Sequence, residues 1–175
     1  MPPSGKGASP GKKGEDHRLG DLLSEELILL DFRARDKWEA IDRILDHLQK
    51  TGKIRPEDRE SARKALVARE NIASTGLGHG VALPHATVET FERPVAALAL
   101  SREGVPFQSS DGKPARLVIL IVIPRRTQKG YVRTLAGIAR LLNYEETREA
   151  LLAAPSQREA LRIVREEEAK EPPKP

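Results

Sequence analysis

One short segment constrains the fold of this chain more than any other: residues 117–123, whose sequence is LVILIVI. Every position in it is apolar. A strand with one solvent-facing side alternates apolar and polar residues, whereas a strand buried on both faces is apolar throughout. The segment is also far shorter than the ~20 residues that a transmembrane helix needs. The sequence therefore predicts a central strand in a sheet that is covered on both faces.

Helical and extended patterns alternate around this strand. Apolar residues recur at helical spacing from Trp38 to Leu48, after an N-cap signal at Asp36 with Glu39 three residues later. Strands mixed with helices predict an α/β fold, with a mixed central β-sheet sandwiched by helices. The expected helices follow Asp36, run from Pro56 to about Arg69, cover 128–142 and 145–153, and begin again at Ser156. The expected strands are 27–32, 81–83, 95–101, 105–107 and 117–123.

Two expectations concern the connections. The segment 71–80 contains three glycines and is predicted to be a loop. The strands 95–101 and 105–107 are predicted to pair through a turn at Glu103 and Gly104.

The domain organisation follows from length and composition. A chain of 175 residues is enough for about one domain, which we place at residues 19–165. Nine of the first 14 residues are Gly, Pro or Ser, so residues 1–18 are predicted to be a disordered basic tail. The charged, proline-containing residues 166–175 are predicted to be a second disordered tail.

Composition also excludes several classes of function. The chain has no cysteine, which excludes disulfides, thiolate metal sites and a cysteine nucleophile. The polar N-terminus lacks a signal peptide, so we expect a cytoplasmic protein that does not insert into membranes. The net charge of +4 is partly in the tail, and a nucleic-acid partner is the weakest alternative. No cofactor is expected, and no metal site, because His79 and His85 lack acidic or cysteine co-ligands nearby.

The candidate site lies in residues 70–86, whose sequence is ENIASTGLGHGVALPHA. His85 follows a short extended piece and Pro84, where a strand is expected to end and a loop to begin. A side chain there can face a ligand from a rigid base. From the residues alone, a structural or merely exposed histidine stays open as the alternative.

This segment resembles a family signature. After Glu70 come six residues, then Leu77 and Gly78, and then the run 81–85, VALPH. The pattern is similar to the active-site signature of the mannitol/fructose-type enzyme IIA domain of the phosphoenolpyruvate-dependent sugar phosphotransferase system. That family includes the nitrogen-regulatory IIA proteins. The resemblance extends over residues 19–165 and implies the IIA fold.

The resemblance implies roles for two residues. His85 would accept a phosphoryl group from an HPr-like carrier, at its outer nitrogen Nε2, and pass it on. A neutral imidazole nitrogen suits this chemistry because it is a nucleophile near pH 7. Arg69 would help to hold the phosphate, since a guanidinium matches phosphate oxygens bidentately.

Other positions carry weaker expectations. Ser74 and Thr75 match a pair found in nitrogen-regulatory members and are candidate phosphate donors, with a turn-capping role as the alternative. The family's second histidine is replaced by Tyr131, which either supports the site or packs. One hypothesis is that His79 substitutes in part for that histidine, with an incidental loop histidine as the alternative. The two remaining histidines, His17 and His47, are expected on the surface.

The resemblance implies a phosphocarrier that transfers a phosphoryl group through a phosphohistidine intermediate. It would serve a sugar-specific IIB component, or regulatory target proteins in nitrogen or carbon regulation. The alternative is a regulatory binding module, phosphorylated slowly or not at all, that contacts a kinase, a transporter or a transcription factor. The tyrosine at position 131 favours this alternative.

Overall fold

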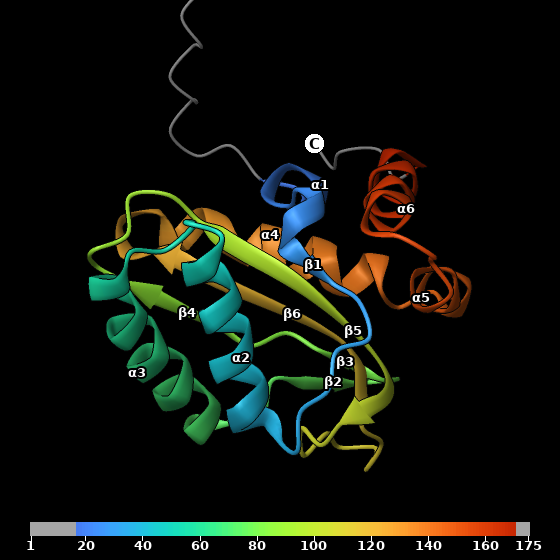
Figure 1. The fold of residues 1–175 in the computed structure, drawn as a ribbon, viewed down its shortest axis with the longest axis horizontal. Coiled ribbons are helices and arrows are strands. Elements are labelled where there is room, and N and C mark those ends of the chain that lie inside the picture. The colour runs from blue at the N-terminus through green and yellow to red at the C-terminus, as the bar shows by residue number, and fades with distance from the viewer. Residues whose placement is uncertain (1–16, 171–175) are drawn as a thin grey trace, which may run out of the picture.

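The computed structural model describes residues 17–170, which form a six-stranded mixed sheet with helices on both faces (Figure 1). In Figure 1, α2 (Lys37–Lys50) and α3 (Pro56–Ile72) lie in front of the sheet, and α4 (Gln128–Leu141) crosses behind it. The predicted α/β class with a mixed sheet between helices is confirmed. Among residues 17–170, no helix combines the length and apolar character needed to cross a membrane.

The predicted central strand is β6 (Ala115–Pro124). All seven residues of the apolar run are at most 2% exposed. The long strand β5 (Val95–Val105) pairs with one edge of β6 in antiparallel orientation, and β1 (Ile28–Leu29) extends the sheet beyond β5. Burial on both faces therefore holds β6 at the centre of the molecule.

The other edge of β6 positions the candidate site. It pairs in parallel first with β3 (Val81–Ala82) and then with β4 (His85–Val88). Strand β2 (Gly76–Gly78) pairs with β3 in antiparallel orientation. The break between β3 and β4 falls at Leu83 and Pro84, and the carbonyl oxygen of Pro84 still accepts from the amide of Ile121.

The helices begin where the sequence predicts. The Asp36 side chain caps α2 by accepting from the amide of Glu39 at 2.9 Å, and Pro56 opens α3. The hydroxyl of Ser156 accepts from the amide of Glu159 at the start of the last helix. The remaining helical segments are α1 (Leu19–Leu22), η1 (Glu25–Leu27), η2 (Arg125–Thr127), α5 (Glu145–Leu152) and α6 (Gln157–Lys170).

Several predicted boundaries are wrong. The segment 71–80 is not a loop: α3 runs to Ile72, and Gly76–Gly78 forms β2. The predicted turn at Glu103 and Gly104 is absent, because β5 continues through a register shift to Val105. Gly104 has a φ of +83°, which lets the strand bulge rather than reverse. The predicted strand 27–32 shortens to Ile28–Leu29.

The two predicted tails differ in outcome. Helix α6 runs to Lys170, so residues 166–170 are helical and the predicted C-terminal tail begins too early. Within it, the Glu168 carboxylate accepts from the amides of Leu19 and Gly20, each at 2.8 Å. Residues 1–16 and 171–175 lie outside the described residues, and the prediction of disorder for them remains a prediction.

Candidate functional site

His85 is the first residue of β4 and lies beside Ile121 of the central strand. The sequence analysis expected a strand to end here, but a strand begins. Side chains alternate along β4: Ala86 and Val88 are buried, whereas His85 and Thr87 are half-buried. The rigid sheet thus fixes the backbone of His85 while its ring keeps partial access to solvent.

The ring nitrogens of His85 have distinct environments. Nδ1 lies 2.7 Å from the carbonyl oxygen of Leu83. A carbonyl only accepts, so Nδ1 carries the proton, and in a neutral ring Nε2 holds the free electron pair. Burial lowers the pKa of His85, the charge of Arg69 lowers it further, and the Leu83 bond and Glu70 oppose these effects. The arrangement favours a neutral imidazole with Nε2 as its nucleophilic atom.

Arg69 lies in the last turn of α3, the helix that packs against β4. Its guanidinium donates to the carbonyl oxygen of Ala73 at 2.9 Å, and its charge is close enough to affect the pKa of His85. The structure therefore brings together the two residues that the sequence analysis placed at the centre of the site. A guanidinium there can meet an anionic group on the ring.

A buried charge network beneath the site was not predicted. The Glu70 carboxylate is 2% exposed and accepts from Lys37 Nζ at 3.2 Å. It also accepts from the amide of Thr75 at 3.0 Å and from its hydroxyl at 2.6 Å. Glu70 opens the signature, and this position is the sequence signal that points to the network. Nothing in the sequence marks Lys37, because lysine is rarely buried.

The hydroxyls of Ser74 and Thr75 are both engaged within the protein. Thr75 is buried and donates to Glu70, as described above. The Ser74 hydroxyl donates to the carbonyl oxygen of Phe107 and accepts from the amide of Gly76 at 3.1 Å. These contacts match the turn-capping alternative rather than the role of phosphate donor.

His79 lies in a turn. It forms the two-residue connection between β2 and β3 with Gly80, and both have positive φ, +54° and +77°. This is the type I′ hairpin geometry, in which asparagine and glycine are favoured. The β6 partners of Val81 and His85 are four residues apart, roughly 13 Å along a strand. His79 lies beyond Val81, so the structure does not bring its backbone position close to His85.

Tyr131 is 4% exposed in the first turn of α4, and burial raises its pKa to about 12. Its ring stacks on His17, with centroids 5.7 Å apart. The packing alternative for Tyr131 therefore has direct support. The two histidines expected on the surface are half-buried, and each has a contact: His17 makes this stack, and His47 Nε2 lies 2.6 Å from the carbonyl oxygen of Glu26.

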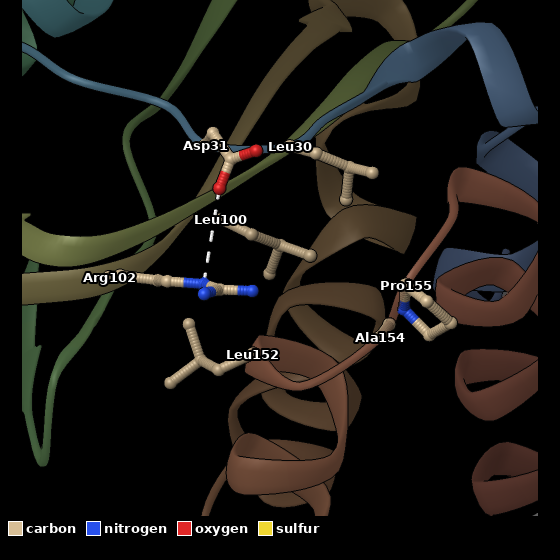
Figure 2. A pocket seen from close by; sticks show the side chains of 7 residues that line it. All are labelled: Leu30, Asp31, Leu100, Arg102, Leu152, Ala154 and Pro155. Carbon is tan, nitrogen blue, oxygen red and sulfur yellow. Dashed lines mark ion pairs between the residues drawn. The ribbon is translucent and has the colours of Figure 1, made fainter.

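Other parts of the described surface are weaker candidates for a functional site. Across residues 17–170, no cluster of three or more His, Cys, Asp or Glu side chains is placed to hold a metal ion. Figure 2 shows a shallow pocket whose walls come from Leu100, Leu152 and Pro155, with the exposed Asp31–Arg102 ion pair (3.9 Å) at its rim. This pocket lies at the β1–β5 side of the sheet, with β6 between it and β4. Its two charged side chains, Asp31 and Arg102, pair with each other.

Comparison with protein families gives one match over most of the chain. Residues 21–167 match the model described as phosphoenolpyruvate-dependent sugar phosphotransferase system, EIIA 2. The chain is 36% identical over 138 residues to the fructose-specific EIIA component of Haloferax volcanii, covering 79% of this chain and 88% of that protein. It is 33% identical over 147 residues to the fructose-specific EIIABC component of Bacillus subtilis, covering 84% of this chain. It spans only 23% of that larger protein.

Solved structures give the same result. The nitrogen regulatory protein IIA-Ntr of Neisseria meningitidis superimposes with a TM-score of 0.75 at 28% identity, covering 83% of this chain and 97% of that one. The mannitol enzyme IIA of Escherichia coli, solved in complex with phosphorylated mannitol enzyme IIB, gives a TM-score of 0.68 at 28% identity. This second match covers 82% of this chain and 97% of the other.

Proposed function

Since this chain belongs to the EIIA 2 family of the phosphoenolpyruvate-dependent sugar phosphotransferase system, its role is that of a phosphocarrier or regulatory component, and we propose that His85 is its phosphoryl acceptor. The single observation that carries the proposal is the bond from Nδ1 of His85 to the carbonyl oxygen of Leu83. It commits the proton to Nδ1 and leaves the electron pair on Nε2.

The transfer balances with these groups. The Nε2 electron pair forms a bond to phosphorus while the bond from phosphorus to the donor's histidine nitrogen breaks, and the electron pair returns to the donor. One phosphorus–nitrogen bond replaces another, so the exchange changes no oxidation state and needs no oxidant. Arg69 supports the step because a guanidinium stabilises the charge on the phosphoryl oxygens. In the reverse sense, the same geometry passes the group to the next acceptor.

The proposed donor is an HPr-like phosphocarrier, and a cytoplasmic location is part of this proposal. The proposed acceptor is a IIB component or a regulatory target. The IIB proposal draws on the relative solved in complex with phosphorylated mannitol enzyme IIB. The regulatory proposal draws on the nitrogen regulatory relative.

The test is phosphorylation by phosphoenolpyruvate, enzyme I and an HPr-type carrier, followed by intact mass spectrometry at neutral to alkaline pH. We expect the mass of one acid-labile phosphoryl group on the wild-type chain and none on His85→Ala. The matched control is His47→Ala, which removes a half-buried histidine of α2 and should be labelled like the wild type. Label that persists in His85→Ala would reject the assignment.

A second candidate function is the regulatory binding module. Tyr131 favours it, because a buried phenol stacked on His17 replaces the second histidine that the family usually has. A folded wild-type chain that accepts no phosphoryl group from a cognate carrier would favour this function over the first.

A further inference from the structure

A continuous series of hydrogen bonds runs from α2 to the ring of His85. Lys37 Nζ donates to the Glu70 carboxylate, and Thr75 donates to the same carboxylate through its hydroxyl and its amide. The carbonyl oxygen of Thr75 accepts from the amide of Leu83 at 3.0 Å. The carbonyl oxygen of Leu83 then accepts from His85 Nδ1.

We propose that Glu70 and Thr75 are positioning residues that hold the Leu83 carbonyl against His85 Nδ1 and so keep Nε2 as the nucleophilic atom. As a statement about phosphoryl transfer, this inference rests on the proposed function. As a statement about the imidazole, it can be tested in the unphosphorylated protein.

The local strands need such support. β2 has three residues and β3 has two, so few backbone bonds hold this part of the sheet. Leu83 lies outside both strands, and Pro84 after it has no amide hydrogen to donate. The hydrogen bond from the amide of Leu83 to the carbonyl oxygen of Thr75 is therefore a main restraint on the backbone at Leu83. Glu70 fixes Thr75, the residue just before β2, where this hydrogen bond forms.

The energetics of the network also support a positioning role. Lys37 and Glu70 are both nearly inaccessible, and transferring two charges from water into the protein is costly. Buried ion pairs often contribute little net stability, and their best-supported benefit is to select one conformation over others. Here the conformation selected is that of the segment leading to His85. The tautomer of a histidine is commonly set by the hydrogen bond that its other ring nitrogen makes, and neighbouring groups hold that partner in place.

The decisive comparison uses Thr75→Val and Thr75→Ser. Valine keeps the shape and the amide but removes the hydroxyl that donates to Glu70, whereas serine keeps the hydroxyl. The matched control is Thr147→Val, which removes a buried threonine hydroxyl in α5. Nitrogen-15 correlation spectra of the imidazole report the tautomer and the pKa of His85, and the phosphorylation assay reports the transfer rate.

We expect the Nδ1–H tautomer in the wild type, Thr75→Ser and Thr147→Val. In Thr75→Val we expect a mixture of both tautomers, a lower His85 pKa because the Leu83 bond is weakened, and transfer about tenfold slower or more. Glu70→Gln should change the tautomer in the same direction. It provides an independent variant if Thr75→Val does not fold.

A single Nδ1–H tautomer in folded Thr75→Val or Glu70→Gln would overturn the inference. If transfer also slowed in Thr75→Val, the hydroxyl would affect transfer by a route other than the tautomer of His85. Failure of the proposed function is a separate result: the wild type would not be phosphorylated on His85, while the tautomer comparison would still decide the positioning role.

Discussion

At the scale of single residues, the protonation of His85 decides its chemistry. Burial and the charge of Arg69 both disfavour the imidazolium, so the pKa of His85 should lie below the ordinary value of about 6.5. We therefore predict that its imidazole titrates below that value in proton or nitrogen-15 spectra. Because the neutral ring is the nucleophile, the phosphorylation rate should fall as pH falls, and it should reach half of its plateau at a pH below that value.

The same reasoning predicts the effect of Arg69→Gln. Removing the positive charge removes one cause that lowers the pKa of His85, so the titration midpoint should move up. The transfer rate should fall by about tenfold to a hundredfold because the guanidinium no longer stabilises the phosphoryl oxygens. Arg63→Gln in the same helix is the control, since Arg63 pairs with Asp42. A midpoint that moves down in Arg69→Gln would contradict this account.

For His79 the turn geometry makes a different prediction from the sequence analysis. His79→Asn should retain the phosphorylation rate and the stability, because asparagine tolerates positive φ and suits the first position of a type I′ turn. His79→Val should lose about 1–2 kcal/mol in urea unfolding, since a β-branched residue is strained there. A slow His79→Asn variant would restore the idea that His79 substitutes for the missing second histidine.

The sequence signals for the candidate site residues are local. The pattern that ends at Pro84 and His85 identified the candidate nucleophile, and the spacing to Arg69 identified its neighbour. Hydrogen-bond partners were not predictable in this way. The partner of Ser74 is Phe107, and Glu70 pairs with Lys37, both far away in the sequence.

At the scale of elements, local patterns were again predictable from the sequence, and long-range pairing was not. β6 and α2 were predicted because apolar runs and helical periodicity are properties of the segment itself. β2 and β4 have only three and four residues, and their extended form depends on pairing with strands elsewhere in the chain. The continuation of β5 past Gly104 also depends on its pairing with β6, so sequence alone favoured a turn.

The buried pair between Lys37 and Glu70 joins the start of α2 to the end of α3, and it makes an element-level prediction. Glu70→Ala should lower the free energy of unfolding by about 3–5 kcal/mol, because it leaves a buried ammonium without its partner. The double variant Lys37→Met with Glu70→Ala should lose less than the sum of the single losses. Urea unfolding of all four proteins measures this coupling, and strictly additive losses would contradict it.

At the scale of the whole molecule, the two ends of the described chain meet. Leu19 and Gly20 donate their amides to the Glu168 carboxylate, and Arg18 donates to the carbonyl oxygen of Glu168. A Cβ atom on Gly20 would lie 2.8 Å from a Glu168 carboxylate oxygen, so glycine permits this close approach. Just before this contact, His17 stacks on Tyr131 of α4. The first described residues therefore tie α6 to α4.

The contact between the two ends of the described chain predicts that Glu168 contributes to global stability, although it lies near the end of α6. Glu168→Ala leaves two amides of α1 without their acceptor and should lower the free energy of unfolding by roughly 2 kcal/mol. The thermal midpoint should fall by about 4–8 °C, and the amides of Leu19 and Gly20 should exchange faster with solvent.

The matched control is Glu167→Ala, because Glu167 pairs with the exposed Lys170 and such pairs contribute about 0–1 kcal/mol. Gly20→Ala should resemble Glu168→Ala, since the added methyl group would push the carboxylate away. If Glu168→Ala were as stable as Glu167→Ala, the contact between the two ends would be incidental. Stability that falls in Glu168→Ala and Gly20→Ala but not in Glu167→Ala would instead show that this contact stabilises the folded state.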